Sequence, residues 1–229
     1  DYGFITCKDS EGNGSPGEFR FNGWGNKFNA AEDNLANQRY LASMCKSVLR
    51  SSPIVAEGGA LEIDEDGHLL STAQCLLNPE RNGDMSLSAY EDAFKDMLGC
   101  SKVTILQHGH LEGDDTDGHI DTLVRFTPNK GLVVQACNNR PNDSHFEGLK
   151  ALCDECALEL PEHEQFHLPL PNIVNDEGSR LPASYANYLI CNNAILLPVY
   201  GEEEDAEAIE TVKRAHPNHI VEPIDCSVL

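Results

Sequence analysis

Basic residues are scarce in this chain. Its 229 residues include 16 Lys and Arg against 38 Asp and Glu, and the formal net charge is −22. A surface this acidic repels the phosphates of nucleic acids and attracts small cations by electrostatic steering, although acidity in many proteins serves only solubility. We therefore expect no nucleic-acid partner, and a small cationic ligand is compatible with the charge.

A long apolar run and a signal peptide are also lacking. A helix that crosses a bilayer needs roughly 20 apolar residues, so we expect no membrane partner. Nine cysteines, an odd number without a secretory signal, favour a reducing cytoplasm. Cys153 and Cys156 are the one close pair, but they fall in a helical pattern and no second pair completes a metal ligand set. We expect both on the buried face of a helix.

The most informative feature that is present is a repeated order of strand, strand, helix and strand. The clearest copy has strand-like residues 60–64 and 68–72, a helical pattern at 87–98 and a strand-like run at 103–106. Ser88 and Glu91 resemble a capping box for this helix, and Gly99 is a typical helix stop. Alternating and helical periodicities thus succeed one another within about fifty residues.

Three further copies show the same order. The third copy has strands at 120–126 and 132–136, a helix at 144–158 and an alternating strand at 166–170. The fourth has strands at 185–191 and 195–199, a helix at 202–215 and a strand at 220–224. The first has strands at 4–6 and 19–21, a helix lined by Leu41, Met44, Cys45, Val48 and Leu49, and a strand at 54–55.

These copies predict an α/β fold made of modules of about sixty residues. We expect one domain with modules at about 1–56, 57–113, 114–171 and 172–229. Such units stack or close radially, because one unit cannot bury its apolar faces alone. In a radial arrangement the residues that open each module would face a common centre.

Three module starts combine carboxylates with glycine: Asp1-Tyr2-Gly3, Glu57-Gly58-Gly59 and Asp117-Gly118-His119-Ile120-Asp121, the last of which adds a histidine. Carboxylates that converge on one cavity need a cation, and a planar guanidinium matches them in bidentate pairs. On a strand, His119 and Asp121 would share one face. Each feature also has a plainer explanation, because Glu-Gly-Gly is common in turns and a single histidine is often structural. Residues 114–118 resemble a calcium loop, but the first and twelfth ligand positions of an EF-hand are wrong.

Several segments together resemble the agmatine deiminase and bacterial peptidylarginine deiminase family. They are residues 1–3, 21–25, 57–59, 72–82, the Asp-Thr-Asp-Gly-His-Ile-Asp stretch at 115–121, and residues 182–187. The resemblance runs essentially from end to end. It implies a pentein-type α/β propeller of repeated ββαβ modules with the active site at the axis, and four of the five modules are expected here.

The same resemblance implies roles for individual residues. His119 would be the general acid and base, Glu57 and Asp121 would hold the guanidinium nitrogens, and Asp1 would add a further carboxylate on the substrate. A cysteine thiolate would attack the guanidinium carbon, and neither a metal nor an organic cofactor is implied. Agmatine is the expected substrate, with peptidyl-arginine or free arginine as the runner-up. Some penteins are not enzymes, which leaves a binding module as the alternative.

The family's nucleophile lies in a C-terminal His-Cys motif that follows glycines, and we find no match to it in this chain. Cys226 belongs to the stretch that precedes the motif. We therefore expect the native protein to carry an N-terminal extension and a C-terminal segment that together form the fifth module, and we expect this chain alone to be inactive and poorly soluble. A homo-oligomer is compatible with the sequence.

Overall fold

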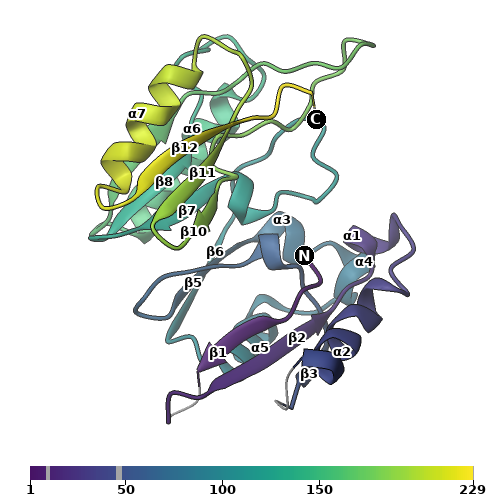
Figure 1. Cartoon of the computed structure of the whole chain (residues 1–229). Coiled ribbons are helices and arrows are strands. Elements are labelled where there is room, and N and C mark those ends of the chain that lie inside the picture. Colours follow the sequence, from purple (N-terminus) through teal and green to yellow (C-terminus); the bar gives the residue numbers. More distant parts are fainter. Residues whose placement is uncertain (9–10, 45–47, 229) are drawn as a thin grey trace. The chain divides into compact units, whose positions relative to one another are not determined.

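The computed structural model describes residues 1–8, 11–44 and 48–228. The chain divides into two compact units, Asp1–Ile105 and Leu106–Leu229, each of which has its own internal contacts. Four three-stranded sheets are distributed between them (Figure 1). Among the described residues, no helix is long and apolar enough to cross a bilayer.

The first unit contains two sheets, in the orders β1-β2-β3 and β4-β5-β6. The first sheet comprises β1 (Ile5–Lys8), β2 (Gly14–Arg20) and β3 (Arg50–Val55), and the second comprises β4 (Glu62–Ile63), β5 (His68–Thr72) and β6 (Lys102–Leu106). β1 pairs antiparallel with β2, which pairs parallel with β3. The helical elements are α1 (Gly23–Asn26), α2 (Asp33–Met44), η1 (Gly58–Ala60), α3 (Ala73–Leu76), α4 (Pro79–Asn82) and α5 (Leu87–Leu98).

Helix α5 closes the core of this unit. Its buried side chains Tyr90, Phe94 and Met97 are three or four positions apart, so they lie on one face of the helix. They pack with residues of the two sheets and of the segments between them: Phe19, Ala56, Leu69, Leu76 and Cys100. Each large side chain buried in this way contributes about 1.5–3 kcal/mol.

The ends of α5 correct one prediction and confirm another. The N-cap is Ser86, whose hydroxyl accepts a hydrogen bond from the Ala89 amide, so the predicted capping box of Ser88 and Glu91 is wrong. Gly99 ends the helix in the left-handed conformation at φ 70°, as expected of a C-terminal glycine.

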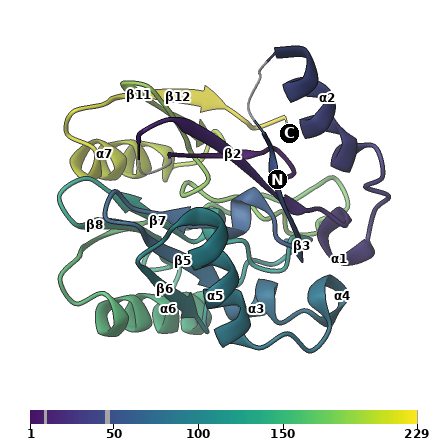
Figure 2. The same cartoon turned by 90° about the horizontal axis from the view of Figure 1, so that it is seen from below.

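The second unit also contains two sheets, in the orders β7-β8-β9 and β10-β11-β12. Their strands are β7 (Val124–Thr127), β8 (Gly131–Gln135), β9 (Glu164–Leu168), β10 (Leu189–Cys191), β11 (Ala194–Val199) and β12 (Ile220–Asp225). In each sheet the first pair is antiparallel and the second is parallel. The helical elements are η2 (Ile120–Thr122), α6 (Phe146–Glu159) and α7 (Asp205–Ala215). Helix α7 contacts both sheets, at β8, β9 and β12, so the two share a core (Figure 2).

The repeated strand, strand, helix, strand order is confirmed in all four sheets, and the pair of cysteines in α6 is buried as expected. Burial raises the pKa of Cys153 to about 11 and that of Cys156 to about 12, so both are inert core thiols. The division of one domain into modules at 1–56, 57–113, 114–171 and 172–229 stays a prediction.

Several predicted element bounds are wrong. The strands predicted at 19–21 and 54–55 extend over Gly14–Arg20 and Arg50–Val55. Residues 120–122 form the short helix η2, and the paired strand begins only at Val124. The expected strand at 185–191 is paired only over 189–191, because Tyr185 and Tyr188 are core side chains that precede β10. The strand at 60–64 shrinks to the two residues of β4, after η1. Helix α2 ends at Met44, so Val48, which is 83% exposed, does not line it; Cys45 lies outside the described residues.

Candidate functional site

Two of the four predicted site residues, Asp1 and Glu57, are brought together in the first unit. The amide of Gly58 donates to the Asp1 main-chain carbonyl at 3.0 Å, and the amide of Gly59 donates to the Asp1 Oδ1 at 2.8 Å. The Glu-Gly-Gly segment thus carries one carboxylate itself, and its two glycine amides hold the main-chain carbonyl and the carboxylate of Asp1. This contact joins the Asp1 residue to the segment that begins with Glu57, so two predicted substrate-binding residues lie on segments in direct contact.

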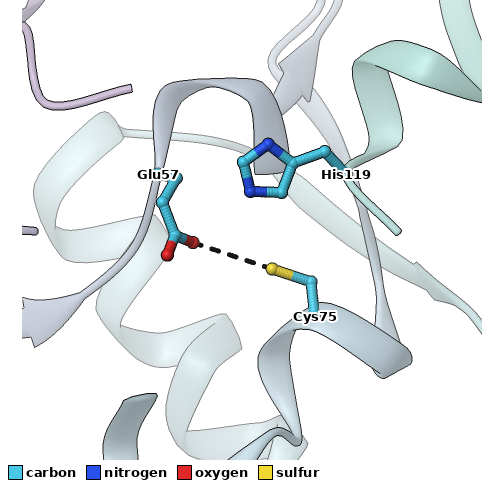
Figure 3. Close-up of side chains that lie close together, drawn as sticks. All are labelled: Glu57, Cys75 and His119. Atoms are coloured by element: carbon cyan, nitrogen blue, oxygen red, sulfur yellow. Dashed lines mark hydrogen bonds between the residues drawn. The ribbon is translucent and has the colours of Figure 1, made fainter. Parts of the chain in front are cut away.

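Glu57 lies two residues after the end of β3, in an extended conformation at the start of η1. Its carboxylate accepts hydrogen bonds from the Arg81 Nε, at 2.9 Å to Oε1 and 3.1 Å to Oε2. The Cys75 thiol donates to Oε2 at 3.7 Å (Figure 3). The side chains of Glu57 and Arg81 are both 0% exposed. A buried ion pair is tolerated only when its geometry and its hydrogen bonds compensate for lost hydration.

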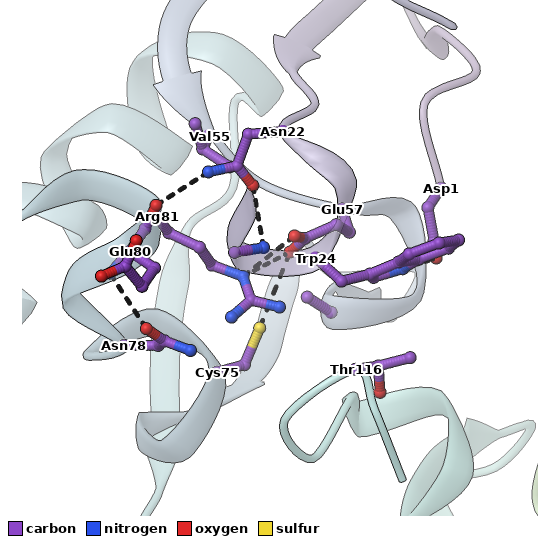
Figure 4. A network of polar contacts seen from close by, with 12 residues as sticks. Asp1, Asn22, Trp24, Val55, Glu57, Cys75, Asn78, Glu80, Arg81 and Thr116 are labelled. Carbon is purple, nitrogen blue, oxygen red and sulfur yellow. Dashed lines mark hydrogen bonds and ion pairs between the residues drawn. The ribbon is translucent and has the colours of Figure 1, made fainter. Parts of the chain in front are cut away.

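Helix α4, which carries Arg81, is fastened to the end of β3 through its last residue. The Asn82 Oδ1 accepts from the Val55 amide at 2.9 Å, and its Nδ2 donates to the Val55 carbonyl at 2.8 Å. The same Nδ2 donates to the Tyr90 hydroxyl at 2.7 Å, and burial raises the pKa of that phenol. The hydrogen bonds of Asn82 therefore fasten the helix of Arg81 to the strand that leads to Glu57. Figure 4 shows the ion pair of Arg81 and Glu57.

Asp1 has a second donor, the indole of Trp24, which lies in α1. The Trp24 Nε1 donates to the Asp1 Oδ2 at 2.8 Å. Four consecutive residues of α1 have positive φ: Gly23 at 69°, Trp24 at 55°, Gly25 at 78° and Asn26 at 64°. A left-handed conformation costs a residue with a Cβ roughly 1–2 kcal/mol, and such outliers concentrate at functional sites.

The other two predicted residues, His119 and Asp121, lie in the second unit. His119 is 2% exposed and immediately precedes η2, and Asp121 is the middle residue of that 3₁₀ turn. The expectation of one strand face is therefore wrong, because residues two apart in a 3₁₀ turn point to different sides. The Thr122 hydroxyl donates to the His119 carbonyl at 2.9 Å, and this local bond favours the turn over strand pairing.

The loop before His119 is organised by Asp114. Its carboxylate accepts hydrogen bonds from the Thr116 amide at 2.8 Å and from the Gly118 amide at 2.6 Å. The next turn has Asp117 at φ 67° and Gly118 at φ 78°. Asp114 therefore stabilises the tight loop that precedes His119 and fixes the position of His119 at the start of η2.

Three residues around the two carboxylates were given no role by the sequence: Arg81, Trp24 and Cys75. All three belong to segments that carry the family resemblance, and membership in those segments is the one sequence signal that could have pointed to them. Their partners lie 24, 23 and 18 positions away along the chain. No local periodicity reveals contacts over such distances.

Comparison with known proteins gives consistent matches along the whole chain. The model of the Porphyromonas-type peptidyl-arginine deiminase family matches residues 1–229. An agmatine deiminase of Medicago truncatula is 30% identical over 241 residues, which cover 92% of this chain and 63% of the relative. The chain spans about two thirds of the length of the curated relatives it matches.

Solved structures give the same result. A Porphyromonas gingivalis structure that is provisionally named an arginine deiminase is 39% identical, with a TM-score of 0.91, over 99% of this chain and 68% of that one. A C. jejuni agmatine deiminase variant with substrate bound is 30% identical, with a TM-score of 0.90, over 98% of this chain and 66% of that one. The predicted pentein-type α/β fold is thereby confirmed.

Proposed function

Because the chain belongs to the Porphyromonas-type peptidyl-arginine deiminase family, we propose that it supplies substrate-binding and acid-base residues to a hydrolase that deiminates agmatine. The products are N-carbamoylputrescine and ammonia, a step toward putrescine. The observation that carries the proposal is the contact of Asp1 with the residues that follow Glu57: the Gly58 amide donates to the Asp1 carbonyl and the Gly59 amide donates to the Asp1 carboxylate. We further propose a cytoplasmic location.

The environment of Glu57 supports a guanidinium ligand. The carboxylate already binds one guanidinium group, that of Arg81, and each carboxylate oxygen has two lone pairs with which it can accept further N–H donors. Asp1 adds a second anion, and the net charge of −22 attracts a cationic substrate to the protein. Carboxylates keep the bound guanidinium charged, so its carbon is more electrophilic than that of a neutral guanidine.

The proposed reaction proceeds in two steps and needs neither a metal nor an organic cofactor. A cysteine thiolate attacks the guanidinium carbon, and ammonia leaves with a proton from His119 while Glu57 and Asp121 hold the remaining nitrogens. His119 then takes a proton from water, which attacks the amidino carbon and releases the thiolate. In total one water is consumed, and one C–N bond is replaced by a C–O bond.

The thiolate in this scheme comes from the C-terminal His-Cys motif of the family. Within the described residues, Cys75 is a poor candidate, because it is fully buried and its thiol donates to a carboxylate. Cys153 and Cys156 have raised pKa values and are buried core thiols.

The substrate preference follows from charge. Agmatine has a guanidinium at one end and an ammonium at the other, with no carboxylate, so an acidic site accepts both ends. Free arginine would need a cation for its carboxylate, and no arginine stands at a module start. In assays of ammonia release by the native protein that carries this chain, we expect agmatine to be preferred to arginine. Equal or faster turnover of a peptide with an internal arginine would instead assign the activity to peptidyl-arginine.

Three substitutions test the proposed roles in the same assay. His119→Ala should lower turnover by about 10² to 10⁴, as is typical for loss of a general acid and base. Glu57→Gln and Asp121→Asn should weaken both binding and turnover, because each removes a charge opposite the substrate cation. His167→Ala, at an exposed histidine of β9, is the control and should leave turnover unchanged. Wild-type rates in the His119 variant would refute the mechanism.

A further inference from the structure

The left-handed turn at residues 23–26 is held by contacts on both sides. A Cβ on Gly23 would lie 2.1 Å from the Phe28 carbonyl oxygen, so no larger residue fits there. The Asn22 Oδ1 accepts from the Gly25 amide at 3.0 Å, and the Asn22 Nδ2 donates to the Glu80 carbonyl of α4 at 2.8 Å. The turn is thus anchored to the helix that also carries the partner of Glu57.

The indole of Trp24 is fixed within this turn by two other rings. Phe21 and Phe28 each meet it edge to face, at centroid distances of 5.1 and 5.6 Å. Because the backbone and the ring are both held, the direction of the indole N–H is set before any ligand arrives. That N–H points to the Asp1 carboxylate (Figure 4).

The two oxygens of Asp1 have different donors. Oδ2 accepts from the Trp24 Nε1 and Oδ1 accepts from the Gly59 amide, both at 2.8 Å. Two donors on two oxygens determine the plane of the carboxylate, which a single contact would leave free to rotate. Asp1 is exposed, so without these donors its side chain would sample several rotamers.

We propose that Trp24 is a positioning residue which orients the Asp1 carboxylate for a guanidino or ammonium cation. The left-handed conformation of a bulky residue persists because it directs the indole N–H to this carboxylate. Trp24 acts through Asp1 and need not touch the substrate. The inference rests on the proposed function, because it assumes that Asp1 binds the substrate.

The variant that separates orientation from packing is Trp24→Phe in the native protein. Phenylalanine keeps an aromatic ring between its two neighbours and removes only the N–H donor. We expect the KM for agmatine to rise about tenfold, as for loss of one hydrogen bond to a charged group, while kcat stays within about twofold. Phe28→Tyr is the matched control, because it changes an exposed ring next to the indole and keeps both the ring packing and the donor, and its KM should stay near that of the wild type.

Two outcomes would overturn the inference: an unchanged KM in the Trp24→Phe variant, or an equal rise of KM in the Phe28→Tyr variant. If the wild-type protein releases no ammonia from agmatine, the proposed function fails. The contact between Trp24 and Asp1 is then tested by tryptophan fluorescence, which needs no activity. Trp24 is the one tryptophan of the 229 residues, and the difference between the wild-type and Trp24→Phe emission spectra gives its emission. Asp1→Asn should shift that emission, and an unchanged spectrum would show that the carboxylate does not hold the indole.

Discussion

Substitution of Arg81 by Met tests the buried ion pair that Arg81 forms with Glu57. Both side chains of the pair are 0% exposed, and the Arg81 Nε lies 2.9 Å from the Glu57 Oε1. Methionine keeps most of the aliphatic stem, but it leaves the carboxylate buried without its cation. Removal of one partner of such a pair costs about 3–5 kcal/mol. Urea unfolding of the native protein should show a loss of this size in the free energy of unfolding.

The control is Arg39→Met, which makes the same chemical change at an exposed pair. Arg39 and Glu32 lie 2.8 Å apart with 65% and 80% of their side chains exposed, and such pairs contribute about 0–1 kcal/mol. The double variant Glu57→Gln/Arg81→Met should lose less than the sum of its single variants, because no uncompensated charge remains. A loss below about 1 kcal/mol for Arg81→Met would refute the reasoning.

Three other changes have expected outcomes. Cys75→Ser keeps a donor for the neighbouring carboxylate and should retain turnover within about tenfold of the wild type; complete loss would identify Cys75 as the nucleophile. Gly23→Ala should lower the free energy of unfolding by more than about 1 kcal/mol, because φ is 69° and the added methyl group has no space; a neutral effect would contradict the observed turn. Burial lowers the pKa of His216, which bonds to the Tyr188 hydroxyl, to about 4. Folding favours its neutral form, so the stability that His216 contributes is complete above about pH 6.5 and is lost as the pH falls toward 4. Between pH 7.5 and pH 5 the free energy of unfolding should therefore fall by about 2 kcal/mol more in the wild type than in His216→Gln.

Elements whose signals are local could be predicted from the sequence. Helix α5 was predicted with its observed bounds because its apolar residues recur at helical spacing and Gly99 provides a stop. The strands β5, β8 and β11 were recognised because each is a short run of apolar residues between turn residues. Repetition of these local patterns was enough to identify the α/β class and the ββαβ order.

Predictions from local patterns were wrong where tertiary contacts determined the local conformation. Residues 185–188 have strand-like composition, yet Tyr185, Ala186 and Tyr188 are buried in the core of the second unit without belonging to a paired strand. His119 and Asp121 alternate as in a strand, but the hydroxyl of Thr122 stabilises a 3₁₀ turn at that point. Burial and hydrogen bonding of this kind depend on residues that the pattern does not contain.

The sequence by itself determined the class of fold and the family, because the strand and helix pattern repeats and the resemblance is nearly continuous. The roles of Asp1, Glu57, His119 and Asp121 stay predictions from that resemblance. Only the tertiary structure decided how the carboxylates are held. Arg81 and Trp24 reach Glu57 and Asp1 across 24 and 23 positions of the chain. They do so only after α4 has packed against β3 and α1 has packed against α4. Side-chain orientation at a site is a property of that packing, which no single segment encodes.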